Sequence, residues 1–267
     1  MRSDRSWASG QRAWNANLSA RRTGIVRSVP FTLLPAVDVS RGRLGLYTPE
    51  GPGPSEAFEG DPVAAARAFT AAGARWLHVV DMDLAFSGAV GGEAVIGAIA
   101  AACPGARIQA SGGVRTWAQA SALLEAGATR VVLGSAALGD EEAARGVLAR
   151  LGDRALVGIE VQEGRIRSRG VDPVDLDLMA TVGWLVGLDV AGFLLTSVQR
   201  VAGLAGPDLE FVPRVARTGR PTLVAGGIAT LEDLRAAREA GAVGAVVGRA
   251  ALEGDLDLSE AFAWAQA

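Results

Sequence analysis

The sequence predicts an α/β fold: a single (β/α)8 TIM barrel built from two similar (βα)4 halves. Two observations lead to this prediction, a strict alternation of strand-like and helix-like segments and an internal repeat of glycine motifs. Alternation favours a parallel sheet with crossover helices, but an open doubly wound sheet shows the same pattern. The repeat separates the two, because two equivalent halves of four strands each close into a barrel.

The strand candidates are short runs rich in β-branched residues, which recur from Phe31 to the end of the chain. Runs of about four to eight such residues between turn signals are typical of strands. Strands are expected at residues 33–39, 76–81, 107–110, 130–133, 156–161, 192–196, 222–225 and 242–247. Helices are expected between them, among others at residues 61–72, 117–126, 141–151 and 231–240.

The internal repeat relates residues of the first half to residues of the second half at a fixed offset. The run Ser111-Gly112-Gly113-Val114 returns as Ala225-Gly226-Gly227-Ile228, which is 114 residues later. At the same offset, residues 125–128 return as 239–242 and residues 134–138 return as 248–252. Chance similarity over so many aligned positions is improbable, so the closed barrel is favoured over the open sheet.

Composition restricts the chemistry more than the net charge of −3 does, although that charge argues against a nucleic-acid partner. All 26 basic residues are arginine, which cannot form a Schiff base. One histidine and one cysteine leave no disulfide and no zinc cluster, so acid–base chemistry falls mainly to carboxylates. The sequence has no apolar run near the roughly 20 residues of a membrane span. A cytoplasmic protein without a membrane partner is expected.

The first 28 residues differ from the rest. They carry six arginines against one acid, with no apolar periodicity and no apolar stretch of the kind a secretory signal requires. A disordered extension or a start codon assigned too far upstream is expected for residues 1–28, with an organelle presequence as a further possibility. The barrel is expected to span residues 29–267.

Glycine motifs follow four of the expected strands and predict two phosphate sites. Glycine lets backbone N–H groups turn toward an oxyanion, and short helices after such loops point their positive ends at the same place. The loops after the last two strands of a barrel are a common phosphate site. The expected binding residues are Ser111, Gly112, Gly113, Gly134 and Ser135 at one site, and Ala225, Gly226, Gly227, Gly248 and Arg249 at the other. Two sites on one mouth imply a small-molecule substrate with a phosphate at each end.

Several stretches resemble one known family. They are residues 33–39 (LLPAVDV), residues 77–83 (LHVVDMD), residues 111–115 (SGGVR) and the two glycine pairs of the second half. Together they resemble the phosphoribosyl isomerase of histidine biosynthesis, including its bifunctional actinobacterial form. The likeness extends from about residue 29 to the end of the chain.

The resemblance implies an Amadori rearrangement, in which a bis-phosphorylated imidazole-carboxamide aminoaldose opens its ribose ring and becomes an aminoketose. A general acid must protonate the ring oxygen, and a base must take the proton from C2. Asp38 matches the catalytic aspartate of the family, Thr196 its active-site threonine and Ser111 a serine near one phosphate. Neither a cofactor nor a metal is implied, and a monomer is expected.

Four positions depart from the family pattern. Glu160 stands where the family has aspartate, and Val201 stands where it has the aspartate that acts as general acid. Leu46 replaces an arginine that grips substrate, and Val171 replaces a tryptophan that stacks on it. Three functions therefore stay open: an isomerase in which Glu160 or a loop residue supplies the acid, a diverged paralogue acting on another phosphorylated sugar or nucleotide, and a catalytically silent phosphate-binding barrel.

Two further expectations concern residues outside these motifs. His78 lies in the middle of a strand between apolar neighbours, so a structural role is expected for it rather than a catalytic one. The first loop, residues 48–60, is rich in proline and glycine, so order is expected only with ligand bound, if at all.

Overall fold

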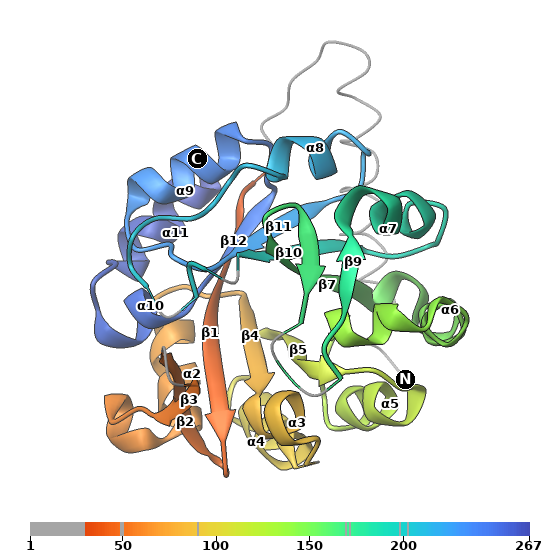
Figure 1. The fold of residues 1–267 in the computed structure, drawn as a ribbon. Coiled ribbons are helices and arrows are strands. Elements are labelled where there is room, and N and C mark those ends of the chain that lie inside the picture. Colours follow the sequence, from red (N-terminus) through yellow and green to blue (C-terminus); the bar gives the residue numbers. More distant parts are fainter. Residues whose placement is uncertain are drawn as a thin grey trace.

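A closed ring of eight parallel strands forms the centre of the protein (Figure 1). The computed structural model describes residues 30–48, 51–89, 91–168, 170, 172–197, 199–201 and 203–267. In order around the ring the strands are β1 (Thr32–Ser40), β4 (Trp76–Asp81), β5 (Arg107–Val114), β6 (Arg130–Leu133), β7 (Ala155–Gln162), β10 (Gly192–Ser197), β11 (Thr222–Ala225) and β12 (Gly244–Val247). Pairing of β7 with β10 and of β12 with β1 closes the ring. The predicted (β/α)8 barrel is confirmed.

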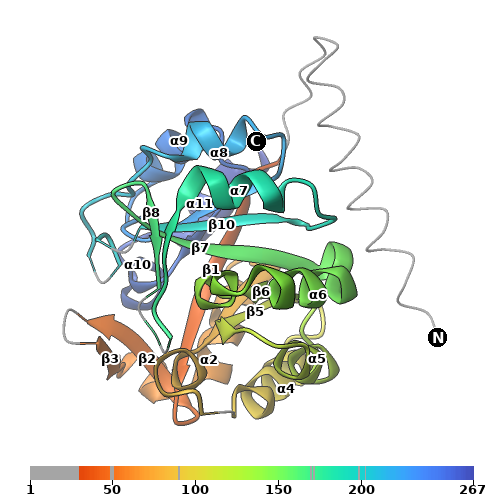
Figure 2. The ribbon, with the colours of Figure 1, turned by 45° about the vertical axis from the view of Figure 1, so that its right-hand side comes forward.

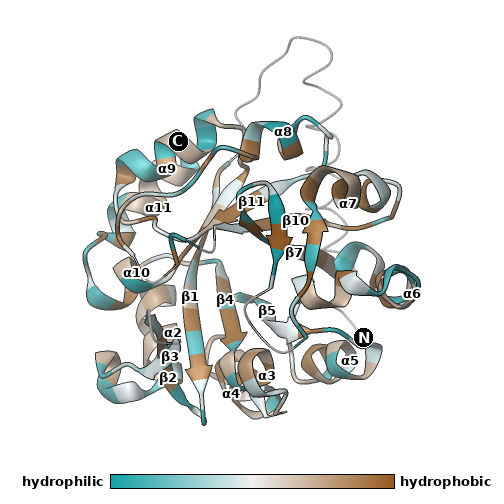
Figure 3. Cartoon of the chain, viewed as in Figure 1, coloured by the Kyte–Doolittle hydropathy of each residue, from teal (hydrophilic) through white to brown (hydrophobic). Residues whose placement is uncertain are grey.

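Both faces of these strands are buried. A cluster inside the barrel consists of Leu34, Ala36, Val132, Leu156, Ala191, Leu194, Leu223 and Val246. A larger cluster joins the outer face of the strands to the surrounding helices. Strands buried on both faces form continuous apolar runs, which is why the sequence marks them clearly. Figure 3 shows the apolar colour gathered on the strands and hydrophilic colour on the outer turns of α6 and α9.

Helices surround the ring on its outside (Figure 2). They are α2 (Pro62–Ala71), α3 (Met82–Ser87), α4 (Gly92–Ala102), α5 (Trp117–Glu125), α6 (Glu141–Leu151), α7 (Leu178–Leu185), α8 (Val212–Ala216), α9 (Leu231–Glu239), α10 (Arg249–Glu253) and α11 (Leu258–Gln266). Among the described residues, the connections also hold three short 3-10 helices, η1 (Ala57–Gly60), η2 (Ser135–Gly139) and η3 (Gly152–Arg154).

The helix caps repeat at the offset of the sequence repeat. Thr116 begins α5 with a capping box that Gln119 completes, and Thr230 begins α9 with a capping box that Asp233 completes. Each hydroxyl accepts a hydrogen bond from a backbone N–H of the first turn, which would otherwise have no partner in the helix. The two halves thus share the local chemistry that starts their helices.

Each half also opens with a two-stranded hairpin after its first barrel strand. Strand β2 (Arg43–Thr48) pairs with β1, and β8 (Arg165–Arg167) pairs with β7. The turns are Arg41-Gly42 and Glu163-Gly164, with φ values of 51° and 75° in the first and 52° and 75° in the second. Positive φ at both central residues is the geometry that matches the twist of a two-residue hairpin. A third strand, β3 (Gly51–Pro54) or β9 (Asp175–Asp177), extends each hairpin.

All eight expected strands and the four named helices are present, with ends that shift by at most a few residues. The expectation for the first loop is wrong over its described part, because Gly51–Pro54 pairs with β2 and residues 57–60 form η1. Pro52 and Pro54 occupy alternate positions of β3, which has β2 as its strand partner. Proline is tolerated on such an edge because no second strand needs its missing N–H.

The expectation for residues 1–28 lies outside the described residues. Over the rest of the chain, apart from the short gaps named above, no helix has both the length and the apolar character needed to cross a membrane.

We expect Gly192→Ala to destabilise the fold by about 2 to 4 kcal/mol. Gly192 has φ of +151°, and a Cβ there would lie 2.3 Å from the carbonyl oxygen of Pro221. Gly183→Ala is the matched control, because Gly183 is an exposed residue of α7 with open space around its Cα. That change should stabilise by about 0.5 to 1 kcal/mol. Urea unfolding measures both, and equal effects would contradict the prediction.

Candidate active site

A single pocket at the carboxyl ends of the barrel strands gathers every residue that the sequence nominates. It is lined by Asp38, Glu160 and Thr196, and by both glycine groups in full: Ser111, Gly112, Gly113, Gly134 and Ser135, with Ala225, Gly226, Gly227, Gly248 and Arg249. Because parallel strands place all their carboxyl ends on one rim, residues far apart in the sequence meet there.

The order of strands sets the geometry of the mouth. Strands β1 and β7 are four positions apart in the ring of eight, so Asp38 and Glu160 lie on opposite sides. The glycine groups, on β5–β6 and on β11–β12, are also four positions apart. Carboxylates and glycine groups therefore alternate around the mouth. A ligand stretched from one glycine group to the other passes between the two carboxylates.

The first glycine group is a backbone feature that only glycine permits. Gly112 and Gly113 have φ of 119° and 71°, and they interrupt the register between β5 and β6. A Cβ on Gly112 would lie 2.2 Å from the carbonyl oxygen of Asp81, and one on Gly113 would lie 2.8 Å from the Cα of Ala85. The chain thus turns tightly against α3 and leaves its backbone exposed to the pocket.

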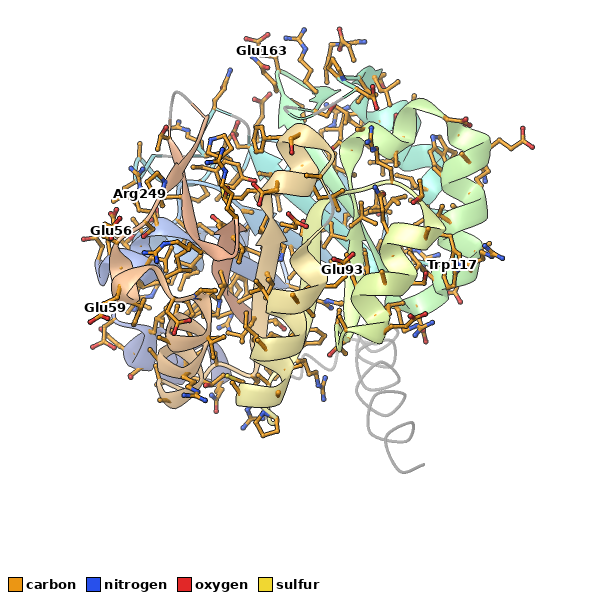
Figure 4. All side chains as sticks on the ribbon, turned by 90° about the horizontal axis from the view of Figure 1, so that it is seen from below. Glu56, Glu59, Glu93, Trp117, Glu163 and Arg249 are labelled. Carbon is orange, nitrogen blue, oxygen red and sulfur yellow. The ribbon has the colours of Figure 1, made fainter. Side chains whose placement is uncertain are left out.

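The second glycine group repeats this geometry. Gly226 and Gly227 have φ of 97° and 81°, and a Cβ on Gly227 would lie 2.2 Å from the carbonyl oxygen of Gly206. The N–H of Gly206 donates to the carbonyl of Gly227 at 3.1 Å, which docks the loop after β10 on this group. Arg249 adds a positive charge and donates from Nη2 to the carbonyl oxygen of Tyr47 at 3.2 Å. Figure 4 shows Arg249 beside the β2–β3 hairpin that carries this carbonyl.

The candidate catalytic residues are fixed by their strands. Asp38 is 6% exposed, while Glu160 and Thr196 are half-buried neighbours in the register of β7 and β10. The hydroxyl of Ser135 donates to the carbonyl of Gly158 at 3.1 Å and accepts from the N–H of Glu160 at 2.9 Å. Ser135 therefore braces the strand that carries Glu160, a role the sequence does not reveal.

Two hairpins and α3 cover the pocket. The rings of Tyr47 and Phe86 meet at 5.8 Å, which joins the β2–β3 hairpin to α3. A Cβ on Gly170 would lie 2.0 Å from the carbonyl oxygen of Ala85, so the β8–β9 connection also packs on α3. An ion pair between Arg115 and Asp172 ties that connection to the end of β5.

Three of the four departures from the family pattern lie in this pocket, and Glu160 is one of them. Leu46 and Val201 both line it, whereas the expectation for Val171 lies outside the described residues. Val201 bonds through its backbone N–H to the carbonyl of Ser197 at 3.2 Å, and its side chain carries no proton to transfer. The ionisable side chains among the described lining residues are Asp38, Tyr47, His78, Arg115, Glu160 and Arg249. Nowhere in the described ranges do three His, Cys, Asp or Glu side chains cluster as a metal site would require.

His78 is a pocket residue that the sequence did not predict as a site residue. The residue is 5% exposed, and its Nδ1 lies 2.8 Å from Nε2 of Gln109. Burial, with the positive charge of Arg130 as the second cause, lowers the pKa of His78 from 6.5 to about 3. The spacing along the strand is the signal that the sequence offers. His78 and Val80 are two residues apart in one strand, so their side chains lie on the same face, and both line the pocket.

Comparison with known proteins identifies the family of this chain. The family model described as "Histidine biosynthesis protein" matches residues 32–257. The chain belongs to this family. A relative from Frankia casuarinae is 38% identical over 235 residues, covering 87% of this chain and 92% of its own. One from Moorella thermoacetica is 37% identical over 238 residues, covering 86% and 97%. Both relatives are named as phosphoribosyl imidazole-4-carboxamide isomerases.

The lowered pKa of His78 has a consequence for the stability of the fold that can be measured. Because the pKa of His78 is lowered on folding, the unfolded chain binds a proton below about pH 6.5 that the folded chain binds only near pH 3. The contribution of His78 to the free energy of unfolding is therefore present in full above about pH 6.5 and decreases as the pH falls.

We expect His78→Gln to remove this component of the pH dependence. Between pH 6.5 and about pH 5 the wild-type protein should lose about 1.5 kcal/mol more than the variant does. Urea unfolding of both proteins at the two pH values measures the difference, in which the other titrating groups cancel. Parallel loss of stability in the two proteins would show that His78 is not held neutral by burial.

Proposed function

We propose that this protein is a cofactor-free isomerase that converts a bis-phosphorylated phosphoribosyl aminoimidazole-carboxamide aminoaldose into the corresponding aminoketose. The observation that carries the proposal is the alternation of glycine groups and carboxylates around one pocket mouth. A substrate with a phosphate at each end, anchored at both glycine groups, presents its sugar to Asp38 and Glu160. The names of the relatives support this reaction over the diverged and silent alternatives.

The two phosphates bind at opposite ends of the pocket in this proposal. Backbone N–H groups at Gly112 and Gly113 hold one, with Ser111, Gly134 and Ser135 around it. The group of Ala225, Gly226, Gly227 and Gly248 holds the other, and the guanidinium of Arg249 neutralises part of its charge. Anchoring both ends leaves the ribose little freedom, so the reacting carbons stay near the carboxylates.

The chemistry needs one proton donor and one proton acceptor. A carboxylic acid protonates the ring oxygen while the C1–O bond breaks, and the amino nitrogen supplies the electron pair that forms the C1=N bond. A carboxylate then removes the proton from C2, and the C2–H electrons form C1=C2 as the C=N pair returns to nitrogen. Tautomerisation of this enaminol gives the C2 ketone with a proton at C1. Atoms and electrons balance within the substrate, and no external oxidant or reductant takes part.

The location of Val201 supports an assignment of the acid and base roles. Val201 stands on the loop after β10, and β10 is the strand that pairs with β7. An acid at that position and Glu160 act on the same side of the ligand, whereas Asp38 lies across the mouth. Glu160 therefore takes the role of the acid and Asp38 that of the base. Thr196, adjacent to Glu160, offers a hydroxyl to the same part of the sugar.

The remaining features of the proposal concern the whole chain. The protein works as a cytoplasmic monomer whose ligand is the small phosphorylated substrate, without metal, nucleic acid or membrane.

We expect Asp38→Asn to lower kcat by about 100- to 10,000-fold, because the amide cannot accept the C2 proton. Substrate affinity should change little, since phosphate contacts carry it. Asp83→Asn is the control: Asp83 accepts from Ser40 at 2.8 Å outside the pocket lining, so kcat should stay near that of the wild type. Turnover assays with calorimetric binding measure both variants, and an active Asp38→Asn protein would refute the proposed base.

We expect Glu160→Gln to lower kcat by about 100-fold or more, because it removes the proton donor. Adding Val201→Asp to that variant should raise kcat again by at least about tenfold, because the new carboxyl group lies on the same side of the pocket as Glu160. Val201→Asn in the same background has the same size but no acid, so it should restore nothing. Equal rescue by the two changes would contradict the role given to Glu160.

The first experiment is a turnover assay of the wild-type protein on the aminoaldose, with calorimetric binding of the same compound. Turnover supports the isomerase. Binding without turnover would overturn it in favour of a barrel that keeps its phosphate groups and has given up this chemistry.

A further inference from the structure

A line of buried polar side chains runs through the barrel beneath the pocket. Nε of Arg130 donates to Oε1 of Gln109 at 2.8 Å, and Nε2 of Gln109 lies 2.8 Å from Nδ1 of His78. The three residues come from the neighbouring strands β6, β5 and β4, in that order. Gln109 is fully buried and His78 lines the pocket floor, so the line ends at the substrate cavity.

The proton positions along this line are forced. Arginine has only donors, so the atom of Gln109 that faces Arg130 must be the amide oxygen. The amide nitrogen then faces His78 and can only donate, so Nδ1 of His78 must be the unprotonated ring nitrogen. The ring proton of the neutral imidazole therefore lies on Nε2. The charged donor Arg130 thus decides the tautomer of His78 through the side chain of Gln109.

Arg130 is itself held in place at the other end. Its guanidinium carbon lies 4.1 Å from the ring centre of Trp76, a cation–π contact that fixes the planar group. Trp76 belongs to β4, the same strand as His78, so the line begins and ends on one strand. Burial and the neighbouring charge of Arg107 lower the pKa of Arg130 to about 9, so it stays charged at neutral pH.

We propose that Gln109 and Arg130 are positioning residues that hold His78 as a neutral Nε2–H donor, and that this donor binds a hydroxyl oxygen of the opened sugar chain. The acceptor rests on the proposed function, whereas the tautomer does not. Arg130 from β6 is the charged group that acts on the ring, and the charged side chains that share the pocket with it are Asp38, Glu160, Arg115 and Arg249. With Asp38 and Glu160 as base and acid, the imidazole orients the carbon chain between them.

A neutral donor suits this place better than a charged one. An imidazolium would pair with Asp38 or Glu160 and compete for the carboxylate that must accept or give a proton. Burial keeps the pKa of His78 near 3, so the ring gives a hydrogen bond without giving up a proton. The structural role expected for His78 is therefore incomplete: the ring is buried and braced, and its remaining polar edge serves the cavity.

The tautomer can be tested without any variant, because His78 is the one histidine of the sequence. Nitrogen-15 NMR of the imidazole-labelled wild-type chain should show a protonated Nε2 and a bare Nδ1, unchanged from pH 8 to about pH 4.5. A proton on Nδ1, or titration near pH 6.5, would overturn the proposal. This result does not depend on turnover, so a failed activity assay would refute the isomerase and leave the tautomer standing.

Substitutions in the line test its effect on catalysis. Gln109→Glu presents only acceptors to His78, so it should place a proton on Nδ1, raise the pKa of the ring and lower kcat by about 100-fold. KM should change little, because the phosphate groups are untouched. Unchanged kcat in a folded Gln109→Glu protein with protonated Nδ1 would overturn the catalytic part of the proposal.

A matched pair at Arg130 separates positioning from packing. Arg130→Lys keeps a charged donor for the amide oxygen, so the Nε2–H tautomer should persist and kcat should stay within about tenfold of the wild type. Arg130→Met keeps similar bulk but has no donor, so the tautomer should become mixed and kcat should fall further. Equal NMR signatures and equal kcat for the two variants would refute the role of Arg130.

Discussion

Closure of the parallel ring is the constraint on which the rest of the structure depends. The pairing of β7 with β10 and of β12 with β1 brings strands from the two ends of the chain into one barrel. The carboxyl ends of all eight strands then lie at the same rim, and apolar side chains fill the interior of the barrel. The pocket exists because the barrel is packed below this rim and open above it.

The repeated halves turn this rim into a mouth with pseudo-twofold symmetry. Gly112-Gly113 and Gly226-Gly227 share positive φ values, and a Cβ on any of these four would crowd neighbouring atoms. Each half of the chain therefore contains one glycine pair that brings the backbone close to the cavity. The carboxylates Asp38 and Glu160 are placed by the same repetition. A doubled half-barrel thus suits a ligand with two similar ends and one reacting centre.

The two ends of this site repeat one geometry, whereas its centre does not. The glycine groups are geometrically equivalent in the two halves, whereas the centre combines Val201, Glu160 and the buried line that ends at His78. Backbone phosphate sites depend on φ angles that few residues tolerate, so they resist change. Proton transfer depends on side chains, and a carboxyl group on a neighbouring strand can take over when one is lost.

The sequence by itself determined the fold and the two glycine groups of the pocket, because both follow from local patterns. Apolar runs mark the eight strands, and Gly226-Gly227 repeats Gly112-Gly113 at a fixed offset. Only the tertiary structure decided how side chains from different strands meet. Ser135 braces β7, and Gln109 sets the tautomer of His78, although no periodicity links these residues. Hydrogen-bond partners across a barrel are fixed by register and closure, which the order of residues along one strand does not contain.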